Sequence, residues 1–157
     1  ACALVALQEG WEAATHALIE AHDSFGGAAR EAGVELLVHA CATGAPDVVS
    51  AALAKGADPK GARASDDAIA MTKAASAPRC AAEVLEMLLR HPGADVNQAE
   101  RSGRTALHVA CQLGEAGLVA YLLARGADVH AAAAGGRTPL YVAAESGAAG
   151  CVEVLLS

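Results

Sequence analysis

Six histidines and five cysteines are the side chains in this sequence best suited to hold a transition metal. The cysteines are spread along the whole chain, and no two of them form a C-x-x-C pair. Because zinc sites need ligands in closely spaced pairs, the spacing predicts no metal site. An odd number of widely separated cysteines is also unlike a disulfide framework, so we expect an intracellular, reducing compartment. The five are Cys2, Cys41, Cys80, Cys111 and Cys151.

Acid–base or nucleophilic catalysis needs a histidine on which a carboxylate or a nucleophile converges. His108 has no such companion at a suitable spacing. Asp58, Asp95 and Asp128 each follow a Gly-Ala pair, which is typical of turns in which the carboxylate bonds nearby backbone N–H groups. Neither the P-loop pattern G-x-x-x-x-G-K-[ST] nor G-x-G-x-x-G precedes a helix. We therefore expect no catalytic residue and no bound cofactor.

The composition favours helices and excludes two classes of partner. Hydrophobic residues make up 54% of the 157 residues but aromatic residues only 3%, so the apolar content is mostly Ala, Val and Leu. Ala and Leu are good helix formers, whereas strands favour β-branched and aromatic residues. A net charge of −7 argues against nucleic acid and anionic membranes as partners. Polar residues or glycine interrupt every apolar run, so no direct membrane insertion is expected.

The elements that position these side chains repeat with a period of 33 residues. The segment GRTALHVAC, from Gly103 to Cys111, returns 33 residues later as GRTPLYVAA, from Gly136 to Ala144. Each unit has apolar residues at i, i+3, i+4 and then at i, i+1, i+4, i+5, which predicts two short helices with one buried stripe each. The stripes are Leu37, Ala40, Cys41 with Val48, Val49, Ala52, Leu53; Met71, Ala74, Ala75 with Val84, Leu85, Leu88, Leu89; Leu107, Ala110, Cys111 with Leu118, Val119, Leu122, Leu123; and Leu140, Ala143, Ala144 with Cys151, Val152, Leu155, Leu156.

Glycine and helix-cap residues follow the same period. The intervals between Gly103, Gly114 and Gly126 equal those between Gly33, Gly44 and Gly56. Gly44, Gly114 and Gly147 suit tight turns between helices, where φ is positive. Thr105 and Thr138 suit helix N-caps, and Pro139 suits the first helical position.

The Thr138-Pro139-Leu140 element, the Thr105-x-Leu107-His108 element and the three Gly-Ala-Asp triplets resemble the ankyrin-repeat family. The resemblance implies an all-α solenoid of antiparallel helix pairs, with β-hairpin loops projecting at right angles. It also implies structural hydrogen bonds for His108. We expect one array over residues 1–157: a degenerate first repeat at 1–32, a second at 33–66, an irregular third at 67–102, a fourth at 103–135 and an incomplete fifth at 136–157.

The irregular third repeat is marked by Asp67 in place of glycine and by extra residues near Pro78 and Pro92. Cys80, in the same repeat, is the cysteine that we expect to be exposed, while Cys41, Cys111 and Cys151 fall on the buried stripes. Asn97 resembles asparagines that a dioxygenase hydroxylates in some ankyrin repeats. A plain hairpin asparagine is the alternative.

The resemblance implies binding of another protein through the hairpin tips and the exposed side of the first helices. Residues without a framework role are then the candidate contacts: Lys60, Arg63, Arg101, Ser102, Arg104, Gln112, Leu113, Arg137, Tyr141 and Glu145. Several tips carry arginine, which predicts a locally basic concave face for an acidic partner segment. Ordinary charge scatter is the alternative, because Asp66, Asp67 and Glu100 share the tips.

The sequence thus predicts a non-catalytic interaction module, acting as a scaffold, an adaptor or a subunit of a larger assembly. Two alternatives stay open: a targeting or regulatory segment of a larger enzyme, and a small protein that inhibits one enzyme. The apolar second-helix stripe at the C-terminal end predicts that further repeats or a partner cover that end.

Overall fold

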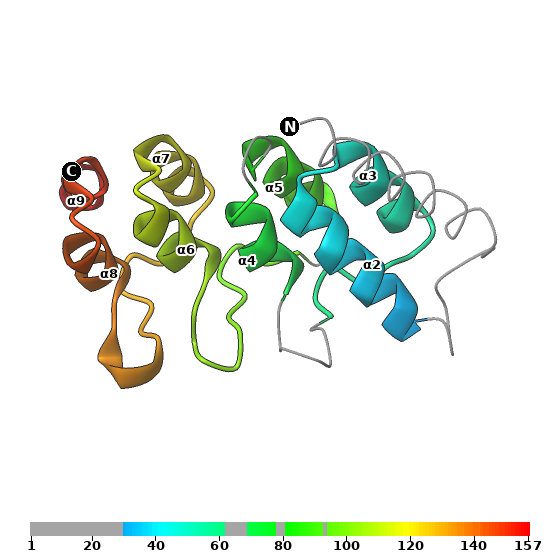
Figure 1. Ribbon diagram of the computed structural model, residues 1–157, viewed down its shortest axis with the longest axis horizontal. Helices are drawn as coiled ribbons and strands as arrows, with labels where there is room; N and C mark the ends of the chain where they lie inside the picture. Colours follow the sequence, from blue (N-terminus) through cyan, green and yellow to red (C-terminus); the bar gives the residue numbers. More distant parts are fainter. Residues whose placement is uncertain (1–29, 62–68, 78–80, 93) are drawn as a thin grey trace, which may run out of the picture.

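A computed structural model describes residues 30–61, 69–77, 81–92 and 94–157. Within these residues eight α-helices form two parallel rows (Figure 1). Helices α2, α4, α6 and α8 pack against one another in one row, and α3, α5, α7 and α9 pack in the other. The bounds are α2 Arg30–Thr43, α3 Pro46–Ala54, α4 Ala70–Ala75, α5 Ala81–Arg90, α6 Ala106–Leu113, α7 Ala116–Ala124, α8 Pro139–Glu145 and α9 Ala149–Leu156.

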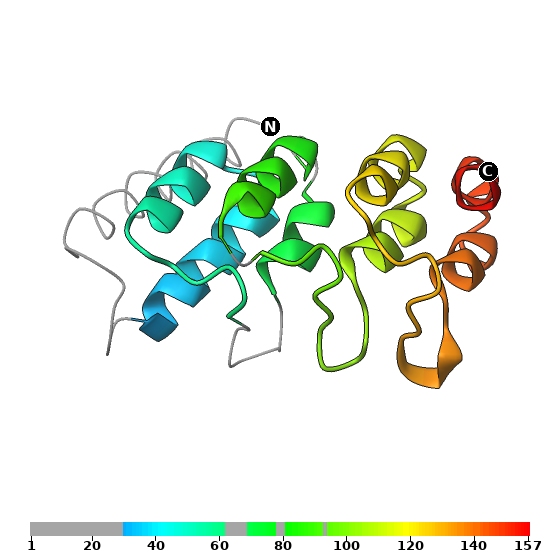
Figure 2. The same cartoon turned by 180° about the vertical axis from the view of Figure 1, so that it is seen from behind.

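The predicted all-α solenoid is confirmed. Each even-numbered helix contacts the odd-numbered helix that follows it, so the chain builds a linear stack of helix pairs. The loops after α5 and α7 leave the helical layers nearly at right angles, which Figures 1 and 2 show from opposite sides. These loops have a hairpin shape without regular strands. An isolated β-bridge joins Ala133 and Arg137, beside a short 3₁₀ turn η2, Ala134–Gly136.

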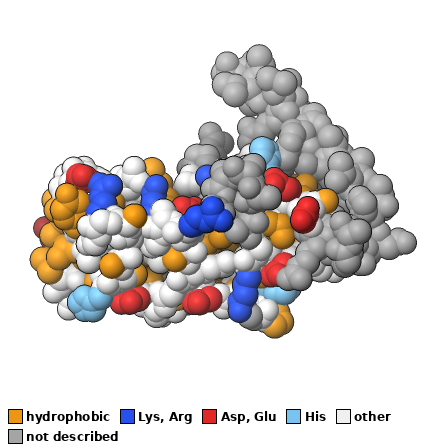
Figure 3. Space-filling model, turned by 90° about the horizontal axis from the view of Figure 1, so that it is seen from below, with side chains coloured by type: hydrophobic (Ala, Val, Ile, Leu, Met, Phe, Trp, Pro, Cys, Tyr) orange, Lys and Arg blue, Asp and Glu red, His pale blue; other side chains and the backbone are white. Residues whose placement is uncertain are grey.

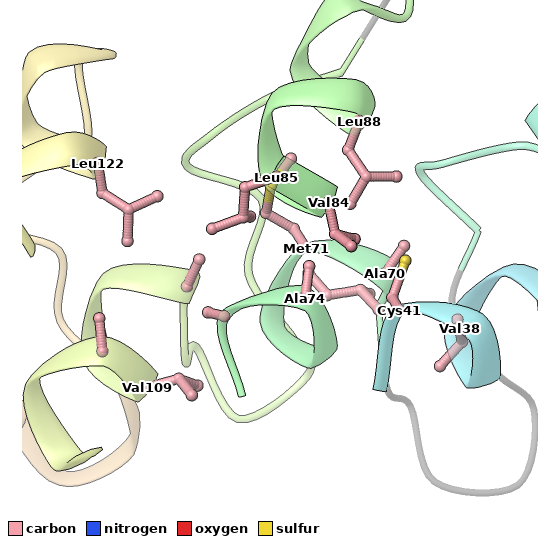
Figure 4. Close-up of a cluster of buried hydrophobic side chains, with 14 of the residues drawn as sticks. Val38, Cys41, Ala70, Met71, Ala74, Val84, Leu85, Leu88, Val109 and Leu122 are labelled. Atoms are coloured by element: carbon pink, nitrogen blue, oxygen red, sulfur yellow. The ribbon is translucent and has the colours of Figure 1, made fainter. Parts of the chain in front are cut away.

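The core lies between the two rows and follows the predicted stripes. In Figure 4, Val84, Leu85 and Leu88 of α5 lie in one cluster with Met71 and Ala74 of α4, and all five are buried. Ala110 in α6 is also fully buried. Small residues such as Ala74 and Ala110 let neighbouring helices of the even row approach closely. Larger residues of both rows, among them Leu107 and Leu122, fill the space between the rows.

The helix ends agree with the predicted caps. Thr138 Oγ1 accepts a hydrogen bond from the Tyr141 backbone N–H at 3.3 Å, and Pro139 is the first helical residue of α8. Gly114 adopts φ = +76° at the C-cap of α6, a conformation that L-residues with a Cβ rarely adopt.

The first helix of the second repeat is longer than its counterpart in the fourth repeat. Gly33 was matched to Gly103, a turn residue with φ = +76°, but Gly33 lies inside the 14-residue helix α2. The position that Thr105 holds in the fourth repeat is Glu35 here. Glutamate is a good helix former without a capping hydroxyl, so the helix continues toward Arg30 and tolerates the glycine at a cost of about 1 kcal/mol.

The last helix pair is less buried than its stripe predicts. Cys151 is fully buried, but Ala144 is exposed, Val152 and Leu155 are only partly buried, and Leu156 is 69% exposed. In the pair before it, Cys111, Val119 and Leu122 at the same register are fully buried, because α8 and α9 cover them. The stripe is therefore present, and within the described residues its outer side has no covering helix.

Candidate functional site

Three equivalent aspartates shape the turns after the odd-row helices. Asp58, Asp95 and Asp128 each accept a hydrogen bond, at 2.9 Å, from the backbone N–H two residues further along the chain. This confirms the predicted turn role, because a short carboxylate bonded in this way replaces a backbone turn bond. The three turns consequently share the same local hydrogen bond.

Side chains also link neighbouring loops. The Asn97 amide donates to the carbonyl of Gly126 at 3.1 Å, and its oxygen accepts from the backbone N–H of Asp128 at 2.7 Å. Gln98 donates to the carbonyl of Lys60 at 2.8 Å. These bonds fix the spacing of the loops. We call the space between these loops and the even-numbered helices the groove. Hydroxylation of Asn97 stays a prediction.

His108 joins its own helix to the next repeat. Its Nδ1 accepts from the backbone N–H of Thr105 at 3.2 Å, and its Nε2 lies 2.9 Å from the carbonyl oxygen of Arg137. The first contact belongs to a capping box at the start of α6. The ring is 1% exposed, and burial lowers the pKa of His108 below its usual value. The structural hydrogen bonds expected of this residue are confirmed.

The third repeat is linked to the loop that follows it by a threonine in place of the histidine. Thr72 holds the register position of His108 and is too short to reach a backbone carbonyl in the next loop. Its hydroxyl instead donates to Glu100 Oε1 at 2.6 Å, so a side chain of the next loop closes the gap. No pattern in the sequence predicts this contact, because the two residues lie 28 positions apart and neither matches the period.

Three cysteines occupy the predicted core positions. Cys41, Cys111 and Cys151 are free thiols that are fully buried. Burial raises the pKa of Cys111 to about 12, and it raises the pKa of Cys41 and of Cys151 as well. Since the thiolate is the nucleophile and the metal ligand, these cysteines are chemically quiet. Cys2 and Cys80 lie outside the described residues.

A polar hollow lies in the groove where the fourth repeat meets the fifth. Its volume is about 150 Å³, and its lining brings together four predicted contact residues: Arg104, Gln112, Arg137 and Glu145. Arg104 Nη2 donates to Gln112 Oε1 at 2.6 Å, and Arg137 forms an ion pair with Glu145. The lining is completed by His108, Ala133, Val142 and Ser146.

The other predicted contacts lie elsewhere. Lys60, Arg101 and Ser102 are exposed loop residues. Tyr141 is 54% exposed, with the Arg137 guanidinium 5.6 Å from its ring centre. Leu113, also 54% exposed, lines a different hollow of about 450 Å³ beside Ala77 and Leu118. Arg63 lies outside the described residues.

Charge on the loop side of the molecule is mixed. Seen from below in Figure 3, Lys and Arg side chains gather along one long edge of the described surface. Asp and Glu side chains lie beside some of them and along the opposite edge. The groove is thus not uniformly basic, and the pairing of each arginine decides the local charge.

Neither a metal-binding cluster nor a membrane-spanning helix is found in the part of the chain that the structure describes. There, no three His, Cys, Asp or Glu side chains gather closely enough to hold a metal ion. None of the helices described has both the length and the hydrophobicity needed to cross a membrane.

A comparison with models of known protein families agrees with the helix pairs, the periodic turns and the capping histidine. The family model described as "Ankyrin repeats (3 copies)" matches residues 71–157, more than half of the chain. No curated protein matches the sequence. The chain belongs to the ankyrin-repeat family, whose repeats are protein-interaction modules.

Proposed function

We propose that this protein is a non-catalytic scaffold, adaptor or assembly subunit that binds another protein in the groove between its loops and even-numbered helices. The observation that carries the proposal is the polar hollow between the fourth and fifth repeats. Four side chains without a framework role meet there, and two of them, Arg104 and Gln112, are hydrogen-bonded in a defined geometry. Arginine is enriched among residues that dominate binding at interfaces.

The positions of the reactive side chains favour a non-catalytic role. His108 is committed to Thr105 and to the Arg137 carbonyl, and the described cysteines are buried. Asp58, Asp95 and Asp128 bond their own turns. Catalysis needs a group that is free to exchange a proton or attack a substrate, and these groups serve the fold instead.

Reversing the charge of Arg101 and Arg104 to Glu tests the proposed face. The partner would first be identified by affinity purification of the native protein, and its affinity for purified wild type and variant would then be measured by calorimetry. We expect weaker binding with an unchanged melting temperature, because both side chains lie on a loop outside the core. A matched control reverses Arg90 and Arg125, which lie at the ends of α5 and α7 in the odd row. Equal affinity of both double variants and the wild type would reject this face.

Two other roles remain as alternatives: a regulatory segment of an enzyme, and a small enzyme inhibitor. Both use the same groove and differ in what the partner does. Activity of the purified partner, measured with and without this protein, separates them from a passive scaffold. Loss of activity upon addition favours the inhibitor, and unchanged activity favours the scaffold.

The outer face of α8 and α9 is a second proposed contact surface. Val152, Leu155 and Leu156 hold the register of Val119, Leu122 and Leu123, which lie on the side of the fourth repeat that meets α8 and α9. An open hollow of about 380 Å³ lies here beside Ala144, Ala148 and Val152. A face built like an existing repeat interface suits another helix pair of the same kind, in this chain or in a partner.

A further inference from the structure

The hollow between the fourth and fifth repeats contains two copies of one arrangement that differ in a single chemical respect. In each copy an arginine at a loop end reaches a side chain eight residues later, on the following even-row helix. Arg104 meets the neutral amide of Gln112, whereas Arg137 meets the carboxylate of Glu145. The two arginines stand 33 residues apart, as do their two partners.

The difference decides where the hollow is positively charged. Glu145 neutralises Arg137, but within the described residues no carboxylate forms an ion pair with Arg104. Gln112 satisfies one N–H of the guanidinium and leaves its charge in place. His108, the other basic side chain of the lining, is buried, and its pKa is lowered, so it adds no charge at neutral pH. The net positive charge of the hollow therefore lies at Arg104.

The size and walls of the hollow limit what binds there. A volume of about 150 Å³ has room for one side chain and is too small for a helix. Ala133 and Val142 give part of the wall an apolar surface suited to the methylene groups of a side chain. With Arg137 and Glu145 paired, one positive charge remains in the hollow, at Arg104. A singly charged carboxylate matches it better than a phosphate, which carries almost two charges at neutral pH.

Building on the proposed binding role of the groove, we propose that this hollow receives one Asp or Glu side chain of a partner protein. The carboxylate binds the guanidinium of Arg104, which Gln112 holds in place. Arg137 does not serve as a second anion site, because Glu145 already neutralises its charge. The partner segment is thus recognised by one acidic residue at this position and not by a run of acidic residues.

The register supplies matched variants that exchange the two environments. Gln112→Glu gives Arg104 the same carboxylate partner that Arg137 has, and Glu145→Gln releases Arg137. The wild type, both variants and Arg104→Met would each be exposed to a phage-displayed library of random short peptides. The recovered peptides would then be sequenced. Circular dichroism and thermal melting would establish that each variant is folded.

We expect the wild type to enrich peptides with one acidic residue, and Gln112→Glu and Arg104→Met to lose that enrichment. Glu145→Gln should enrich peptides with two acidic residues. For one recovered peptide, replacing its acidic residue by the amide should weaken binding to the wild type about tenfold, which is the loss of one charge-assisted hydrogen bond. The same replacement should leave binding to Gln112→Glu nearly unchanged.

The possible failures are distinguishable. Peptides without acidic preference, an acidic preference that persists in Gln112→Glu, or tighter binding of a phosphoserine peptide than of its glutamate counterpart would each overturn this inference and leave the interaction module standing. Recovery of no peptide above background on any folded variant would count against the groove as a binding face, and therefore against both proposals.

Discussion

At the scale of single residues, His108 shows how a reactive side chain becomes part of the framework. It lies between the cap of its own helix and the carbonyl of the next loop, and it is buried. The spacing predicts no catalytic role, because no acid or nucleophile stands at a useful distance along the chain, and the resemblance to ankyrin repeats implies the structural one. The identity of the carbonyl acceptor, Arg137, depends on how two repeats stack, which spacing within one repeat does not reveal.

Replacing His108 by Gln tests how much protonation of this ring lowers the free energy of unfolding. Burial holds the pKa of His108 below the value of about 6.5 expected in an unfolded chain, so the unfolded state takes up the proton first as the pH falls. The contribution of the neutral ring to stability is complete above pH 6.5 and is lost as the pH falls toward the lowered pKa. Between pH 7.5 and 5.5 the wild type should lose about 1 kcal/mol more unfolding free energy than His108→Gln. Urea titrations at each pH measure this difference, and parallel curves would contradict it.

The buried cysteines should resist alkylation. Iodoacetamide reacts with thiolate, and burial both shields Cys41, Cys111 and Cys151 and raises their pKa values. At pH 8 we expect these three sites to stay largely unmodified in the native protein and to react fully in denaturant. Peptide mapping by mass spectrometry reads each site separately. Rapid native labelling of Cys111 would show that α8 and α9 do not cover it as described.

At the scale of elements, the sequence predicted helices better than loops. Period and composition located α6 to α9 and their caps, because small and large apolar residues recur at fixed offsets. Helix α2 is longer than the helix at the same place in the fourth repeat: Gly33 matches the period, but Glu35 and its neighbours favour a longer helix. The link from Thr72 to Glu100 was missed, because it pairs side chains from separate elements. The residues of the hollow were predicted in part, because the alignment of Arg104 with Arg137 is visible in the period and their pairing is not.

Gly103 and Gly136 hold equivalent loop positions with φ of +76° and +73°. A Cβ on Gly103 would lie 3.0 Å from the backbone of the next loop, at Ala132 and Ala133, whereas a Cβ on Gly136 meets open space. Gly136→Ala should cost about 1 kcal/mol for the positive φ alone. Gly103→Ala should cost about 1 kcal/mol more, because backbone must move. Thermal and urea unfolding compare the two variants, and equal losses would contradict the close approach of the loops.

Asn97 and His130 form a second matched pair in the loops. Both stand two residues after a turn aspartate, and the Asn97 amide also makes two bonds to the next loop. Asn97→Ala should lower the unfolding free energy by about 1 kcal/mol, with His130→Ala nearly neutral as its control. Urea unfolding measures both variants. A neutral Asn97→Ala would mean that the loop spacing does not depend on this amide.

At the scale of the whole molecule, the two rows of helices give the surface two sides with different roles. Both rows supply large core residues, such as Leu107 of α6 and Leu122 of α7, while the even row and the loops carry the polar groups that line the groove. Periodicity predicted this division, because framework positions recur and the remaining positions vary. The choice of partner depends on those varying positions, so it lies beyond what the period specifies.

Hydrogen–deuterium exchange of the protein with and without its purified partner tests the central claim most directly, because it reports which side of the stack the partner covers. We predict slower exchange upon binding in residues 102–113 and 135–146, which span the loop ends and the helices α6 and α8. Helices α5 and α7 should exchange at the same rate in both states. Protection confined to α5 and α7, with the groove segments unchanged, would contradict the account.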